Sequence, residues 1–217
     1  MYDNRHRTVS LADRIFDKLE DDILFGRYAK GEILTELRLV EELGVSRTPI
    51  REALSRLAQE RLIADTGKGS VVLGITAEDL QDILNIRLAV EGLATYYATL
   101  NMKEGDLAEL RHILELQEYY AGKNDPSHIK EMDDQFHNLI CTISGRQVIA
   151  DTLRPLHKKI QNYRRASMAS PARAKAATQE HRAIFNAMAA GDAELAKKLT
   201  IEHVQNAKNS ILGKEEK

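Results

Sequence analysis

The chain has 217 residues, a formal net charge of −2 at pH 7, four prolines and no tryptophan, which is a composition typical of a helix-rich protein of one large domain or two small ones. No apolar run approaches the ~20 residues of a membrane span and no signal peptide is evident, so we expect a cytoplasmic protein without a membrane partner. The nearly neutral charge does not exclude nucleic acid, because the local field at a contact face decides phosphate binding.

Residues 10–74 predict a winged helix-turn-helix domain behind a flexible N-terminus at 1–9. Residues suited to capping or ending a helix occur at intervals along this region. The apolar runs on either side of Gly67-Lys68-Gly69 predict a β-hairpin, which is called the wing. The expected elements are helices at 10–26, 35–43 and 46–61, a connector at 28–34, and strands at 62–66 and 70–73.

The stretch from Gly44 to Leu54 reads GVSRTPIREAL and predicts a tight turn followed by a helix with a basic, exposed face. Gly44 can adopt the left-handed conformation that ends a helix, and Ser46 can cap the next one. The apolar residues that follow recur at helical spacing and predict a buried stripe. A helix held by one face, with arginines on the other and its positive end exposed, is suited to reading DNA.

The residues expected to meet DNA lie on this helix, just before it, and on the wing: Thr35, Arg38, Ser46, Arg47, Thr48, Arg51, Arg56, Gly67, Lys68 and Gly69. Arg47 and Arg51 suit bidentate contacts with guanine or clamps on phosphate, and a solvated helix face is the alternative. Arg56 fits an ion pair within the domain equally well. Lys68 suits phosphate or the minor groove, although its Gly-Lys-Gly sequence alone is also typical of an ordinary surface turn.

Residues 75–213 predict an antiparallel all-helical bundle with short loops, followed by a tail at 214–217. The whole chain is therefore expected to be mainly α. Cys141, the single cysteine, lies among apolar residues and is expected to be a buried, inert thiol. A kink is expected at Pro155. The expected helices are at about 77–100, 103–122, 127–144, 146–168, 171–190 and 192–212.

One aspartate and three histidines lie on bundle helices at positions that otherwise carry apolar residues: Asp133, His137, His181 and His203. The first two are four residues apart, so their side chains point the same way from one helix. If the faces meet, the set suits Zn, Ni, Mn or Co with positions left open for water or ligand. The alternative is four unrelated, half-exposed residues. The remaining histidines lack the pattern and are predicted to be surface or packing residues: His6, His112, His128 and His157.

Several motifs together resemble a known family: the GVSRTPIREAL run with its wing, then Arg87-Leu88-Ala89-Val90-Glu91, Asp133-x-x-Phe136-His137 and Glu180-His181-Arg182-Ala183-Ile184. The chain resembles the FadR subgroup of the GntR family of bacterial transcription regulators, with its all-helical FCD domain, over about residues 10–212. One departure is Leu37, which stands where relatives often carry a phosphate-contacting arginine, with Arg38 next to it.

The resemblance implies a homodimeric regulator that binds a palindromic operator in double-stranded DNA. It also implies a divalent metal ion at the aspartate and the three histidines, and a small carboxylic-acid or sugar-acid effector at or beside that ion. Candidate effector contacts are Arg87, Asn162 and Arg164, and an ion pair with Glu91 one turn on is the equal alternative for Arg87.

The expected function is therefore that of a DNA-binding repressor and not of an enzyme. Two alternatives stand beside it. One is a constitutive DNA-binding protein with a structural metal. The other is a metal-dependent hydrolytic enzyme fused to a DNA-binding module, against which no further general base, nucleophile motif or phosphate loop is evident in the sequence.

Overall fold

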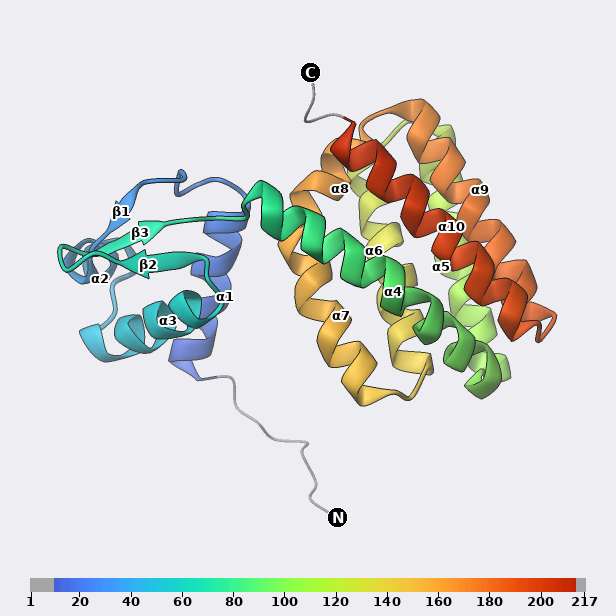
Figure 1. Ribbon diagram of the computed structural model, residues 1–217, viewed down its shortest axis with the longest axis horizontal. Helices are drawn as coiled ribbons and strands as arrows, with labels where there is room; N and C mark the ends of the chain where they lie inside the picture. The colour runs from blue at the N-terminus through green and yellow to red at the C-terminus, as the bar shows by residue number, and fades with distance from the viewer. Residues whose placement is uncertain (1–9, 214–217) are drawn as a thin grey trace, which may run out of the picture. The chain divides into compact units, whose positions relative to one another are not determined.

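The computed structural model describes residues 10–213, which form ten helices and three short strands in two compact units that divide between Ala77 and Glu78 (Figure 1). The fold is mainly helical, as predicted. The flexible N-terminus predicted at 1–9, the tail at 214–217 and His6 lie outside the described residues. Within 10–213, no helix combines the length and apolarity needed to cross a membrane.

The first unit is a winged helix-turn-helix whose helices begin and end at residues suited to helix caps and turns. Its elements are α1 (Leu11–Leu24), β1 (Ile33–Leu34), α2 (Glu36–Leu43), α3 (Arg47–Gln59), β2 (Ile63–Asp65) and β3 (Ser70–Val72). Ser10 and Asp13 form a capping box at the start of α1, and Gly44 ends α2 with a φ of 66°. Leu19, Ile50 and Leu57 are fully buried in a core to which all three helices and the sheet contribute.

The connector expected at 28–34 contains a strand that the sequence analysis did not predict. Ile33 and Leu34 pair antiparallel with Val71 and Ser70, so the sheet has the order β1-β3-β2 and the wing has three strands. A strand of two residues is too short to show the alternation by which strands are recognised. Its position depends on the pairing partner, which lies more than thirty residues away in the chain.

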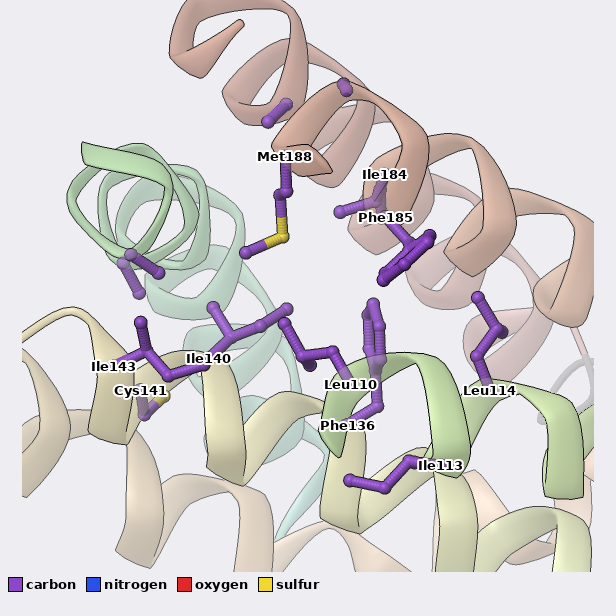
Figure 2. Packing of buried hydrophobic residues seen from close by; sticks show 14 of the residues in the cluster. Leu110, Ile113, Leu114, Phe136, Ile140, Cys141, Ile143, Ile184, Phe185 and Met188 are labelled. Carbon is purple, nitrogen blue, oxygen red and sulfur yellow. The ribbon is translucent and has the colours of Figure 1, made fainter. Parts of the chain in front are cut away.

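The second unit is a bundle of seven helices: α4 (Ala77–Asn101), α5 (Glu104–Gly122), α6 (Pro126–Ile143), α7 (Gln147–Lys159), α8 (Gln161–Met168), α9 (Pro171–Ala189) and α10 (Ala193–Leu212). Figure 2 shows apolar side chains of α5, α6 and α9 pointing into one core, with Phe136 fully buried among them. Cys141 belongs to this core, and burial raises the pKa of its thiol to about 12, which fits the predicted inert role.

The single helix expected at 146–168 is two helices, and the break lies at Ile160, not at the predicted Pro155. Pro155 lies within α7 on its exposed side, where the carbonyl left without a donor is open to water. Ile160 takes a non-helical ψ of 10° and buries its side chain completely. The break turns α8 so that Arg164 reaches Asp133 on α6.

Candidate metal centre and nucleic-acid interface

Four buried side chains from three helices of the bundle converge: Asp133 and His137 on α6, His181 on α9 and His203 on α10. Each is at most 5% exposed, and one ligand atom from each lies within 4.8 Å of the others. Nε2 of His181 is 3.3 Å from Nε2 of His203 and 3.5 Å from Oδ1 of Asp133. Nε2 of His137 is 3.7 Å from the same oxygen. The structure thus brings together all four residues that the sequence analysis singled out.

The other ring nitrogen of each histidine, Nδ1, contacts an acceptor on a different helix. The contacts are His181 with Oε1 of Gln117 on α5 (2.8 Å), His203 with Oε2 of Glu180 on α9 (2.7 Å) and His137 with Oε2 of Glu91 on α4 (3.3 Å). An acceptor at Nδ1 takes the ring proton of a neutral imidazole, which leaves the lone pair on Nε2. For His181 and His203, whose Nδ1 atoms have acceptors within 2.8 Å, the lone pair is then on Nε2, the atom that lies in the cluster.

The residues around the carboxylate of Asp133 pair with only one of its two oxygens. Oδ1 of Asp133 is buried without a partner among the described residues, and Arg164 pairs with Oδ2. Burial opposes ionisation of Asp133, but Arg164 and the nearby imidazoles outweigh it and hold the pKa of this carboxyl far below its ordinary value. Burial also lowers the pKa of His181 and of His203, which keeps both rings neutral at pH 7.

A carboxylate oxygen and three imidazole nitrogens that converge in this way form a ligand set for a divalent cation. Ligand atoms about 2.1 Å from an ion lie roughly 3–3.4 Å apart at bond angles near 90–110°. The separations of 3.3 Å and 3.5 Å around Nε2 of His181 are close to this spacing. The residues present therefore fit a metal ion held by four protein ligands.

Glu91 extends the cluster to a second buried group. Its Oε1 accepts from Nε of Arg87 at 2.5 Å and from Nε2 of His157 at 2.8 Å. The ion pair between Arg87 and Glu91, which was the alternative to an effector contact for Arg87, is thus present. Nη1 of Arg87 is buried without a hydrogen-bond partner among the described residues. Burial opposes ionisation of Glu91, but Arg87 and the neighbouring imidazoles keep its pKa well below the ordinary value. Burial lowers the pKa of His157 to about 4.

The residues that contact the Nδ1 atoms of the three imidazoles were not predicted from the sequence. Glu91 and Glu180 stood within quoted motifs, but no pattern in the sequence linked them to a particular histidine. Gln117 had no signal at all, because it lies 64 positions from His181 on another helix. Arg164, expected near an effector, pairs with Asp133 and also with Asp134, whose Oδ1 is 3.0 Å from its Nη1. Asn162 is half-buried on α8.

In the winged unit, Arg47 and Thr48 are exposed in the first turn of α3. Ser46 occupies the N-cap position, although its hydroxyl makes no capping bond. A groove of about 620 Å³ runs between α3 and the wing, and its lining includes Thr35, Arg51, Lys68, Gly67 and Gly69. In this groove Nε of Arg51 donates to Oε1 of Glu36 at 2.7 Å. The helix α3 and the wing thus border one polar groove.

Two further arginines of the predicted DNA set are paired with acids of their own unit. Arg38 donates to Glu32 and Glu42, both at 2.7 Å. Arg56 donates to Asp13 at 2.6 Å and lies over the ring of Phe16, so the ion-pair alternative for Arg56 is present. Beside Arg38, the hydroxyl of Thr35 caps α2, and the side chain of Leu37 is exposed.

Comparison with known proteins assigns the two units to known domains. The family model described as bacterial regulatory proteins, gntR family, matches residues 11–72, and the FCD domain model matches residues 82–206. The chain belongs to the GntR family. It is a DNA-binding transcriptional regulator with an FCD domain and not an enzyme.

Relatives of this GntR regulator cover nearly its whole length. It is 30% identical to the uncharacterized HTH-type transcriptional regulator YdhC of Bacillus subtilis, over 88% of this chain and 86% of that one. It is 26% identical to the HTH-type transcriptional repressor RspR of Escherichia coli, over 94% and 90%. The solved structure of E. coli McbR/YncC shares the fold, with a TM-score of 0.79, 24% identity, and coverage of 96% and 100%.

The Arg51–Glu36 contact predicts opposite effects of two substitutions on DNA binding. We expect Arg51→Ala to weaken binding by about 1–3 kcal/mol if the arginine reads a base. Glu36→Gln should strengthen it by ~0.5–1 kcal/mol, because it removes an acid and releases the guanidinium. Fluorescence anisotropy with a duplex selected from a random pool by the wild-type protein measures both. Arg14→Ala, at an exposed arginine of α1, is the matched control, and an unchanged affinity for Arg51→Ala would contradict the assignment.

The buried neutral histidines predict that metal-free protein loses stability on mild acidification. A histidine whose pKa is lower in the folded chain binds its proton preferentially when unfolded, so stability falls as the pH drops below the unfolded value of about 6.5. His157, with a folded pKa of about 4, should cost about 1.4 kcal/mol by pH 5.5, and His181 and His203 act in the same direction. Glu91 and Asp133 add a loss below about pH 4.

Urea unfolding of chelator-treated protein, followed by far-ultraviolet circular dichroism at pH 7.5 and 5.5, measures this loss. Equal stability at the two pH values would mean that these imidazoles are not held neutral.

Proposed function

We propose that this regulator is a repressor that binds a palindromic operator as a homodimer. In this proposal a divalent metal ion is held by Asp133, His137, His181 and His203. A small carboxylic acid or sugar acid, bound at or beside the ion, controls the affinity for DNA. The repressor assignment is supported by the relative RspR of E. coli, which is named as a transcriptional repressor.

The observation that carries the metal proposal is the convergence of Asp133 Oδ1, which has no hydrogen-bond partner among the described residues, with the Nε2 atoms of three histidines. Lone pairs that meet without a proton repel one another, and a cation turns the repulsion into attraction. Nitrogen ligands with one carboxylate suit Zn, Ni, Mn or Co. Once bound, such an ion supplies open coordination positions for a ligand oxygen.

The surroundings of the cluster favour an anionic effector. Arg87 has one guanidinium nitrogen, Nη1, buried without a hydrogen-bond partner among the described residues, which supports a role toward an effector carboxylate. Arg164 serves to hold Asp133, because both of its terminal nitrogens lie against aspartates. Asn162 stays a predicted contact. The rival function, a constitutive DNA-binding protein with a structural metal, would take up the ion but bind no acid.

The proposed control acts through the helices that carry the ligands. An acid that ligates the metal bridges α6, α9 and α10 and favours one arrangement of the bundle dimer. That arrangement sets how two winged units meet the two half-sites of an operator. Glu91, which contacts His137, lies on α4, the helix that follows the wing in the chain.

The homodimer proposal rests on a stripe of exposed apolar residues along α4. Ile86, Leu93 and Leu100 are 40%, 39% and 59% exposed. They are spaced seven residues apart, so they lie on one face, as in the seam between paired helices. Large exposed apolar side chains grouped in this way mark protein interfaces more often than open surface.

Removal of two histidines tests the metal. We expect wild-type protein loaded with Zn, Ni, Mn or Co to retain about one ion per chain in elemental analysis, and its Tm to rise with metal concentration because the ion binds only the folded state. His181→Ala combined with His203→Ala should abolish both effects. His112→Ala, at an exposed histidine of α5, is the matched control.

Carboxylic and sugar acids titrated into metal-loaded protein then separate the sensor from its rival. A further rise in Tm together with a changed affinity for the selected duplex supports sensing. A metal-loaded protein that binds none of the acids, with unaltered DNA binding in the double variant, would favour the structural metal.

Substitution on the α4 stripe tests the dimer. Leu93→Asp should convert the wild-type dimer to a monomer in analytical ultracentrifugation, because a buried, unpaired carboxylate opposes association. Val148→Asp, at an apolar residue of α7 that is 81% exposed, is the control and should leave the dimer intact. A Leu93→Asp protein that stays dimeric would move the interface away from this face.

A further inference from the structure

An acidic side chain lies in the groove between α3 and the wing, beside an arginine that is expected to meet DNA. Glu36 is the first residue of α2, and its Oε1 accepts from Nε of Arg51 at 2.7 Å. Their side chains are 35% and 65% exposed. An ion pair this exposed adds little to stability, while an acid on a DNA-binding face repels phosphate. The pair is therefore better explained by the recognition of DNA than by the stability of the fold.

The charged side chains that line this groove balance one another. The lining holds two carboxylates, those of Glu36 and Asp65, and two cations, those of Arg51 and Lys68. A surface that binds phosphate needs a surplus of positive charge, whereas the edges of bases present uncharged donors and acceptors. The groove between α3 and the wing therefore suits the edges of bases better than the backbone of DNA.

The contact with Glu36 occupies the side of the Arg51 guanidinium and leaves its end free. Arg51 donates through Nε, and neither of its Nη atoms makes a hydrogen bond within residues 10–213. These two Nη atoms can donate together to O6 and N7 of one guanine. A carboxylate that holds Nε restricts the rotation of the group, so less conformational freedom is lost when a base binds. The same carboxylate partly neutralises the guanidinium and weakens its attraction to phosphate.

We propose that Glu36 is a positioning residue for sequence recognition, which directs the end of the Arg51 guanidinium toward a guanine and away from the phosphates. This role rests on the DNA contact predicted for Arg51, and it assigns that arginine to guanine where phosphate was the other possibility. An acid that favours a base contact over a phosphate contact raises the ratio of specific to non-specific binding, although it lowers the total affinity. The stronger binding expected for Glu36→Gln agrees with this.

Replacement of single guanines by 7-deazaguanine tests this role, because the analogue still pairs with cytosine but lacks the N7 acceptor. The probe is the duplex selected from a random pool by the wild-type protein, and fluorescence anisotropy at fixed salt measures its affinity. We expect replacement of at least one guanine to cost the wild-type protein about tenfold in affinity. In Arg51→Ala the same replacement should cost nothing. In Glu36→Met, which keeps the length of the side chain but removes the carboxylate, it should cost about threefold or less.

Glu41→Met, at an exposed glutamate of the same helix, is the matched control and should keep the tenfold cost. A cost that depends on Arg51 but is unchanged in Glu36→Met would overturn the positioning role and leave the base contact of Arg51 in place. If no guanine depends on Arg51, the role of Glu36 is overturned as well, and a smaller salt dependence of Arg51→Ala would then assign the arginine to phosphate. The proposed repressor is tested separately, because the wild-type protein selects a duplex only if it binds DNA.

Discussion

A buried carboxylate with one unpartnered oxygen is the constraint on which the interior of the bundle depends. An ionised group removed from water costs several kcal/mol unless other charges or donors compensate it. Arg164 compensates only one oxygen of Asp133, and it can do so because α8 turns away from α7 at Ile160. The other oxygen has no hydrogen-bond partner among the described residues and lies close to the imidazoles of three histidines. The break between α7 and α8, the buried Arg164 and the histidine cluster are therefore parts of one electrostatic arrangement.

The same balance holds for each acid that contacts a histidine of the cluster. The pairs are Glu91 with Arg87, Glu180 with Arg173 and Asp133 with Arg164. Every pair brings opposite charges together, so the polar layer adds little net charge to the core. Apolar packing completes it, since the ring of Phe136 stacks on that of His181 with centroids 4.5 Å apart. Polar contacts that each have one correct partner favour a single packing of the helices.

Local signals explain what could be predicted from the sequence, and long-range contacts explain what could not. Caps and stops such as the Ser10–Asp13 box and Gly44 act within one turn, so most helices were predicted near their observed ends. The cluster could be predicted because Asp133 and His137 share one helix face, His181 lies in a recognised motif, and His203 lies on a helix face that otherwise carries apolar residues. The strand β1, the break at Ile160 and the contact of Gln117 with His181 depend on segments far apart in the chain. No periodicity or propensity carries that information.

The helix α4 contacts the four-residue cluster at one turn, and in the proposed control it is the helix that would carry a change from that cluster toward the DNA-binding unit. Glu91 contacts His137 on α6, and the neighbouring Gly92 has no room for a side chain, because an added Cβ would lie 2.8 Å from Ile201 of α10. Ile201 is two residues before His203. A shift of His137 therefore meets α4 through the contact with Glu91, and a shift of His203 meets it through the packing of Ile201 on Gly92. Because close-packed helices move as rigid elements, the proposed control would move α4 as a body, and α4 follows the wing in the chain.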